Sequence, residues 1–141
     1  MNAEQLNKDL KQDEGLVLKP YRDSVGKLTI GIGRCLDDKG ISEEEANCLF
    51  KNDVNSTSQE LFSTFPWMTE LNDVRQNVFL NMAFNMGVQG LAKFKLTLAY
   101  VQGGHYEMAA QEMLSSLWAK QVGARAIRLA KEMASGEFQN A

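Results

Sequence analysis

The chain has 141 residues, of which 44% are hydrophobic and 23% are charged, and its net charge is −3 at pH 7. This length suffices for one domain with a real core, and the composition argues against disorder. The acidic balance gives no support for nucleic-acid binding. No apolar run approaches the roughly 18 residues that a membrane span needs. Cys35, Cys48 and the single histidine, His105, cannot assemble a zinc site.

The two halves of the chain differ in charge. Residues 1–80 carry 9 Lys/Arg against 14 Asp/Glu, and residues 81–141 carry 6 against 4, so the net charges are −5 and +2. The split indicates either an acidic lobe followed by a mildly basic one or chance variation along the sequence. The first 15 residues are polar and lack the apolar core of a secretory signal, so we expect synthesis in the cytoplasm.

The N-terminal third combines one helix with the only convincing β region. Apolar spacing predicts a short helix over residues 3–13, and Gly15 stands where a left-handed C-terminal cap belongs. Leucine and isoleucine then alternate with small residues in the sequence KLTIGIG, which is typical of a strand. We therefore predict a hairpin or small three-stranded sheet over residues 16–36.

The remainder of the sequence is helical. Ser42 and Glu45 have the spacing of a capping box, and the helix that they open keeps its apolar residues on one side until Pro66. The strongest helical pattern spans residues 71–86 and stops at Gly87. Shorter helices are predicted within residues 90–101 and over residues 106–120 and 124–135. The predicted fold class is α+β and mainly helical.

Two acidic residues of the N-terminal third have unlike local settings. Glu14 falls in the last turn of its helix, where the negative end of the helix dipole favours the protonated carboxyl that a general acid needs. Asp23 falls in a polar turn rich in hydrogen-bond donors, which favours the ionised form. A pair of carboxyls with opposed environments suits glycosidic bond cleavage. The alternative interpretation is a solvated helix-end glutamate and an Asx-turn aspartate with no chemical role.

Thr29 opens the predicted strand, and its hydroxyl could hold a water molecule against Asp23 or could belong to an ordinary β-branched strand residue. Gly31 and Gly33 form a G-x-G sequence like that of nucleotide-binding loops. The third glycine of the nucleotide-binding motif is missing, because Leu36 occupies its place. We therefore interpret the glycines as a place where another backbone or a long substrate lies close to the strand.

The spacing of these residues resembles the signature of the phage-type lysozymes, which are muramidases and endolysins. The signature has the form E-G-x5-Y-x-D-x2-G-x2-T-x-G-x-G, met here by Glu14, Gly15, Tyr21, Asp23, Gly26, Thr29, Gly31 and Gly33. The resemblance continues through the sequences ISEEEANCLFKNDV, DVRQNVFLNMAFNMGVQGLAKF and LWAKQVGARAIRLAKE, so it covers nearly the whole chain. A familiar member of the family is much longer between the strand and the next helix, where this chain has only residues 34–40, so we expect a trimmed β lobe.

The resemblance implies an enzyme that hydrolyses the β-1,4 bond between N-acetylmuramic acid and N-acetylglucosamine, causing lysis. Glu14 matches the general acid of the family, Asp23 its second catalytic carboxylate and Thr29 its water-positioning threonine. The same matching assigns the sugar groove to Cys35, Phe84 and Thr97, and assigns to Arg125 the role of holding Glu14 in place. It also favours inversion at the sugar carbon and implies no metal or organic cofactor.

The resemblance further implies a single lysozyme-like domain over residues 1–141. One lobe would hold residues 14–62 with the sheet, a helical lobe would hold residues 1–13 and 70–141, and the groove would lie between them. We expect a monomer whose partner is the peptidoglycan glycan strand, reached through a separate pore or after lysis. A non-catalytic glycan-binding module, a small helical scaffold and a lytic transglycosylase are the alternatives.

One residue departs from the family pattern, because Arg34 replaces the usual histidine after G-x-G. Asp53 falls on the apolar side of its helix, where a carboxylate needs a cation. We therefore hypothesise that Arg34 pairs with Asp53 and fixes the strand to the helix.

Overall fold

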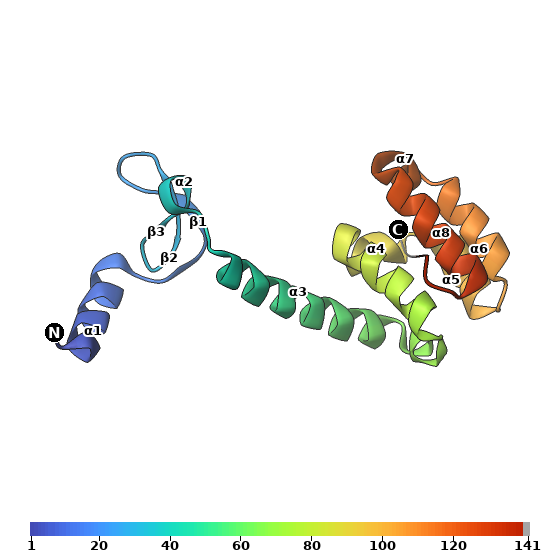
Figure 1. Ribbon diagram of the computed structural model, residues 1–141, viewed down its shortest axis with the longest axis horizontal. Coiled ribbons are helices and arrows are strands. Elements are labelled where there is room, and N and C mark those ends of the chain that lie inside the picture. Colours follow the sequence, from blue (N-terminus) through green and yellow to red (C-terminus); the bar gives the residue numbers. More distant parts are fainter. Residues whose placement is uncertain (140–141) are drawn as a thin grey trace. The chain divides into compact units, whose positions relative to one another are not determined.

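A computed structural model describes residues 1–139, and the chain forms two compact units (Figure 1). The N-terminal unit comprises residues 1–49, and the C-terminal unit begins at Phe50. The boundary between them falls inside helix α3, Glu43–Thr64.

The N-terminal unit contains the small sheet that the sequence predicts. Its elements are α1 (Ala3–Glu14), β1 (Val17–Arg22), β2 (Leu28–Gly31), β3 (Arg34–Cys35), α2 (Leu36–Lys39) and the first part of α3. The three strands are antiparallel in the order β1-β2-β3, so β2 lies in the middle (Figure 1). Thr29 on β2 is therefore paired on one side with Tyr21 and on the other with Cys35.

The G-x-G sequence is a turn, so the predicted strand is shorter than its alternating pattern indicates. Gly31 ends β2, and Ile32 and Gly33 connect it to β3. The φ angles of Gly31 and Gly33 are 73° and 70°. Only glycine adopts this region without a steric penalty, and the positive φ values reverse the chain where the alternation alone predicts that it continues.

The capping box at the start of α3 is confirmed. The Glu45 amide donates to the Ser42 hydroxyl at 3.1 Å, and the Ser42 amide donates to Glu45 Oε1 at 2.9 Å. The predicted pairing of Arg34 with Asp53 is wrong, because Arg34 pairs with Glu45 instead. Arg34 Nη1 donates to Glu45 Oε1 at 2.9 Å, and Arg34 Nη2 donates to Glu45 Oε2 at 2.7 Å. Arg34 additionally donates to the carbonyl oxygen of Gly40, so a nearer carboxylate and a backbone acceptor satisfy it.

These contacts change the ionisation of both side chains. Hydrogen bonds from Arg34, and then from the Ser42 amide, lower the pKa of Glu45 from 4.5 to about 2. The same contact with Glu45 raises the pKa of Arg34. The charged forms are thus favoured in the folded state, and β3 is tied to the first turn of α3 by a bidentate ion pair.

This ion pair predicts an acid-dependent loss of stability. Because the folded pKa lies below the ordinary value, Glu45 stabilises the fold fully above about pH 4.5, and this contribution disappears as the pH falls through about 2. We expect the melting temperature of Glu45→Gln to lie below that of the native protein near neutral pH. The difference in melting temperature should shrink as the pH approaches 2. Glu44→Gln removes a carboxylate from the same helical turn and serves as the control. A melting-temperature difference that stays constant down to pH 2 would contradict this assignment.

The C-terminal unit is helical, as predicted. Its elements after α3 are η1 (Pro66–Glu70), α4 (Asp73–Ala92), α5 (Lys95–Gln102), α6 (Tyr106–Leu114), α7 (Leu117–Val122) and α8 (Ala124–Ser135). Gly87 interrupts α4 with a φ of 80°, as its position predicts, but helical structure resumes directly after it. Gly136 ends α8 in the left-handed conformation.

One predicted helix is divided in two. Residues 106–120 form α6 and the start of α7, separated at Ser115 and Ser116. The Ser116 hydroxyl donates to the Met113 carbonyl at 2.7 Å and accepts from the Ala119 amide at 3.1 Å. The side chain thus replaces main-chain hydrogen bonds at the end of one helix and the start of the next.

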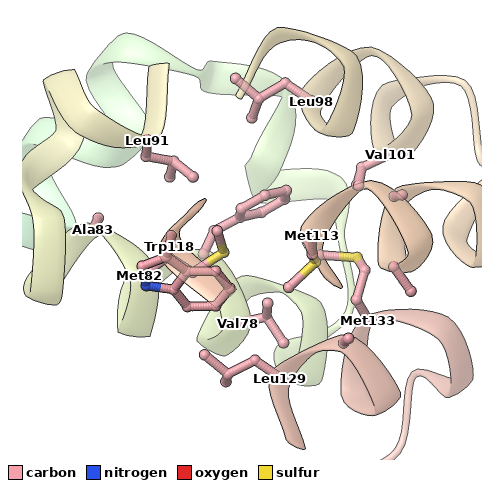
Figure 2. Close-up of a cluster of buried hydrophobic side chains, with 14 of the residues drawn as sticks. Val78, Met82, Ala83, Leu91, Leu98, Val101, Met113, Trp118, Leu129 and Met133 are labelled. Atoms are coloured by element: carbon pink, nitrogen blue, oxygen red, sulfur yellow. The ribbon is translucent and has the colours of Figure 1, made fainter. Parts of the chain in front are cut away.

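The core lies in the C-terminal unit, where α8 packs against α4, α6 and α7, and α5 packs against α6. Figure 2 shows aliphatic, aromatic and methionine side chains from these helices gathered around one centre. The largest fully buried side chains are Phe79, Leu61, Met68, Met82, Leu91, Met113, Met133, Val78 and Val101. Within residues 1–139, no helix is both long and apolar enough to cross a bilayer.

Candidate functional site

Glu14 lies in the last turn of α1, as the sequence predicts, and is its last residue, one position beyond the predicted end. The helix ends there because Gly15 takes a φ of 74°, and its amide donates back to the Lys11 carbonyl at 3.0 Å. The ψ of Gly15 is 175°, so the chain leaves the helix in an extended direction toward β1. The Glu14 side chain is exposed, and within residues 1–139 its carboxyl group accepts no hydrogen bond.

The carboxyl group of Glu14 lies against the turn between β2 and β3. A Cβ atom built on Gly33 would be only 2.7 Å from Glu14 Oε2 and 2.8 Å from its carboxyl carbon. The glycine therefore permits a close approach, as predicted, but the approaching group is Glu14 itself. Glycine at this position leaves room for the carboxyl group beside the sheet.

This contact predicts an effect of Gly33→Ala on activity. The new methyl group would displace the Glu14 carboxyl. With Glu14 in the general-acid role that the sequence resemblance implies, we expect the initial rate of the implied wall lysis to fall by about tenfold or more, since small misplacements of reacting groups are costly. Gly31→Ala is the matched control, because Gly31 has a similar positive φ but nothing within 4 Å of an added Cβ. Both variants should lose about 1–2 kcal/mol of stability through backbone strain. Equal rates in the two variants would show that Gly33 does not position Glu14.

Asp23 forms an Asx turn between β1 and β2. Its Oδ1 atom accepts from the Val25 amide at 3.0 Å and from the Lys27 amide at 2.9 Å. Its own amide donates to the Lys27 carbonyl at 2.9 Å. In the described part of the chain, Oδ2 accepts no hydrogen bond, so one oxygen anchors the carboxylate and the other is available to a ligand.

Thr29 is buried in the middle strand, with 4% of its surface exposed. Its hydroxyl donates to the Lys27 carbonyl at 3.0 Å, the same oxygen that accepts from the Asp23 amide. The Thr29 oxygen keeps lone pairs for a water molecule, because its single hydrogen is engaged. The peptide groups of Lys27 thus link Asp23 to Thr29.

Residues of α2 fix the start of β2, and sequence reasoning missed this contribution. The Leu28 amide donates to Asp37 Oδ2 at 2.8 Å, and Lys27 forms an ion pair with Asp38. The Asp38 contact raises the pKa of Lys27, and the Lys27 contact lowers the pKa of Asp38. The sequence LDDKG carries two neighbouring acids directly after the short strand, which is the signal that could have indicated this support.

Of the residues assigned to sugar binding, Cys35 lies in the N-terminal unit opposite Thr29 in the sheet register. Phe84 lies in the C-terminal unit, where its half-exposed ring packs edge-to-face on Phe50, with ring centroids 5.8 Å apart. Phe84 and Arg125 line one pocket of about 480 Å³, and Thr97 lines another of about 360 Å³. The four predicted supporting residues thus lie in the sheet of the N-terminal unit and in two separate pockets of the C-terminal unit.

Arg125 is held by Asn81, a residue that sequence reasoning did not single out. Its Nε atom donates to Asn81 Oδ1 at 2.8 Å, and its Nη2 atom donates to the Asn81 carbonyl at 3.3 Å. The role of Arg125 beside Glu14 stays a prediction. Among residues 1–139, no three His, Cys, Asp or Glu side chains gather into a group that could hold a metal ion.

Comparisons with known proteins agree on one family. Residues 11–132 match the family model described as Phage lysozyme. Two Dictyostelium discoideum proteins, named Probable T4-type lysozyme 1 and 2, are each 28% identical to this chain. These alignments cover 90% and 92% of this chain, and 92% and 94% of the two proteins.

A third relative is much longer than this chain. The Pre-baseplate central spike protein Gp5 of Enterobacteria phage T4 is 31% identical over 159 aligned residues, which cover 93% of this chain. The same alignment covers only 28% of the spike protein, so this chain corresponds to less than a third of that relative's length.

Proposed function

Because the chain belongs to the phage lysozyme family, and is thereby a glycoside hydrolase, we propose that it cleaves the β-1,4 bond between N-acetylmuramic acid and N-acetylglucosamine in peptidoglycan. One observation carries the proposal: two carboxyl groups of the N-terminal unit have unlike surroundings. Glu14 has no hydrogen-bond partner in the described chain, whereas two main-chain amides hold Asp23. Unlike settings separate the acid role from the base role.

In the proposed mechanism, Glu14 acts as the general acid. Its proton passes to the glycosidic oxygen as the bond to the sugar carbon breaks, and positive charge develops on that carbon. Gly33 supports this role because it leaves room for the Glu14 carboxyl beside the turn. The departing sugar thus leaves as a neutral alcohol.

Asp23 and Thr29 complete the reaction. A water molecule donates one hydrogen bond to the Thr29 oxygen and the other to Asp23 Oδ2, the carboxylate oxygen that has no main-chain partner. Asp23 takes the proton as the water oxygen attacks the sugar carbon, so hydrolysis inverts that carbon and yields the α-anomer. The anchored Oδ1 atom supports this assignment, because it fixes the direction in which Oδ2 points.

The substrate-binding roles of Cys35 and Phe84 extend the proposal. Cys35 flanks Thr29 in the sheet, so a sugar beside the water molecule would contact its side chain. The half-exposed Phe84 ring packs edge-to-face on Phe50 and offers an apolar surface to a sugar ring. Exposed aromatic rings of this kind suit the apolar faces of sugars.

A single assay tests the proposal. The native protein should clear suspensions of outer-membrane-stripped bacterial cells and release new reducing ends, with the α-anomer appearing first in proton NMR spectra. Anhydro-sugar products in place of reducing ends would identify a lytic transglycosylase. Binding to the cell wall without any new ends would identify a non-catalytic glycan-binding module.

A further inference from the structure

One peptide group, between Lys27 and Leu28, joins several parts of the N-terminal unit. Its carbonyl oxygen, which belongs to Lys27, accepts from the Asp23 amide at 2.9 Å and from the Thr29 hydroxyl at 3.0 Å. Its N–H group, which belongs to Leu28, donates to Asp37 Oδ2 at 2.8 Å. The peptide group is planar, and its N–H and C=O point in opposite directions, so a contact that fixes the N–H also fixes the C=O. Asp37 is thereby connected to Thr29.

Asp37 replaces a strand partner that the short sheet does not provide. Strand β3 consists of Arg34 and Cys35, and Cys35 is paired with Thr29. Leu28 precedes Thr29, and at the level of Leu28 the chain has already left β3 and entered α2. The Asp37 side chain, in the first turn of α2, accepts from the Leu28 amide instead. A carboxylate acceptor also polarises the peptide group, which strengthens the hydrogen bonds that its carbonyl oxygen accepts.

The Thr29 hydroxyl depends on this carbonyl more than the Asp23 carboxylate does. Within residues 1–139, the Lys27 carbonyl is the one acceptor that the Thr29 hydroxyl has. The Asp23 carboxylate is anchored separately, by the amides of Val25 and Lys27. With its hydrogen engaged, the Thr29 oxygen can only accept from the water molecule of the proposed reaction. The lone pairs of that water then stay available for the sugar carbon.

We propose that Asp37 is a positioning residue for the attacking water molecule. Asp37 orients the peptide group between Lys27 and Leu28, the carbonyl of that group holds the hydrogen of the Thr29 hydroxyl, and the Thr29 oxygen holds the water. The inference rests on the proposed function, because that function supplies the water and the sugar. Asp37 acts through the peptide group and not on the substrate.

Steady-state kinetics on soluble glycan strands test this role. Asp37→Ala removes the acceptor, so kcat should fall by about tenfold with little change in KM, since a small displacement of a reacting group is costly. Asp37→Asn keeps a side-chain oxygen for the Leu28 amide and should recover most of the loss. The matched control is Asp38→Ala, which removes the neighbouring carboxylate of α2, the ion-pair partner of the Lys27 side chain. Its kcat should stay near the native value, and equal falls in the two alanine variants would overturn the inference.

A double substitution tests the route through Thr29. In the Thr29→Val background the hydroxyl is absent, so adding Asp37→Ala should lower kcat by much less than it does in the native protein. Melting curves of the same preparations establish that each variant is folded. The same fold-loss of kcat in both backgrounds would show that Asp37 does not act through the Thr29 hydroxyl, and would overturn the inference.

A measurement without substrate separates this inference from the proposed function. If the native full-length protein releases no new reducing ends, the proposed function fails, and NMR spectroscopy of the same protein still tests the arrangement. Three-bond couplings should show one Thr29 side-chain rotamer in the native protein and in Asp38→Ala, and averaged rotamers in Asp37→Ala. The Leu28 amide should also exchange faster with solvent in Asp37→Ala. A Thr29 rotamer that is unchanged in Asp37→Ala would refute the positioning role.

Discussion

Glu14→Gln is expected to lose about 10²–10⁴-fold of its lytic rate, the range that general acid catalysis contributes. Glutamine has nearly the shape of glutamate but cannot transfer a proton to the leaving oxygen. The side chain is exposed and has no hydrogen-bond partner in the described chain, so the melting temperature should change little. Turbidity loss of stripped cells and thermal melts on the same preparations measure both effects.

The matched control for this variant is Asp13→Asn. Asp13 is the preceding residue of α1, is also exposed, and loses the same charge on substitution. Its lytic rate should stay near that of the native protein. Equal losses in both variants would indicate a general effect of charge on wall binding, and retained lysis in Glu14→Gln would remove Glu14 from the mechanism.

Phe79→Ala should produce the largest loss of stability, about 3–5 kcal/mol, as is usual for removing a buried phenylalanine. Phe79 is fully buried, and its ring packs edge-to-face on Trp67 with centroids 6.2 Å apart. Truncation would leave a cavity among the other buried side chains of the core. Urea unfolding followed by circular dichroism gives the change in free energy.

Phe138→Ala removes the same side chain from a half-exposed position. We expect it to cost much less, because surface substitutions usually change stability by about 0.5 kcal/mol or less. Comparable losses in the two variants would mean that the C-terminal unit does not depend on its buried core in the manner described.

Features that depend on local chemistry could be read from the sequence. The capping box of Ser42 and Glu45 forms as its spacing predicts. The end of α8 at Gly136 is also correct, since a left-handed residue is needed there and glycine supplies it. Glu14 lies at the end of α1 because the next residue has a positive φ. In each case the residue acts on neighbours within a few positions.

Features that depend on competition between partners could not be read in this way. Sequence reasoning paired Arg34 with Asp53, whereas the structure pairs it with Glu45. The choice follows from the bidentate geometry together with the Gly40 carbonyl, and neither is visible in a pattern of residue types. Likewise, the apolar period of residues 106–120 is continuous, but the hydroxyl of Ser116 breaks the helix.

The candidate site also combines features that the sequence predicts with contacts that it does not. Residue types and spacing pointed to Glu14, Asp23 and Thr29 because each suits a distinct chemical role. The contact between Glu14 and Gly33 could not be foreseen in that form, since it joins a helix end to a turn nearly twenty residues later.

The link between Asp23 and Thr29 runs through the backbone of Lys27, and this has an evolutionary consequence. Any of the common amino acids except proline supplies the amide and the carbonyl that the link requires. Mutational drift at this codon can therefore alter the charge beside the site, at the modest cost of the exposed pair with Asp38. The coupling of the carboxylate to the threonine would be inherited unchanged.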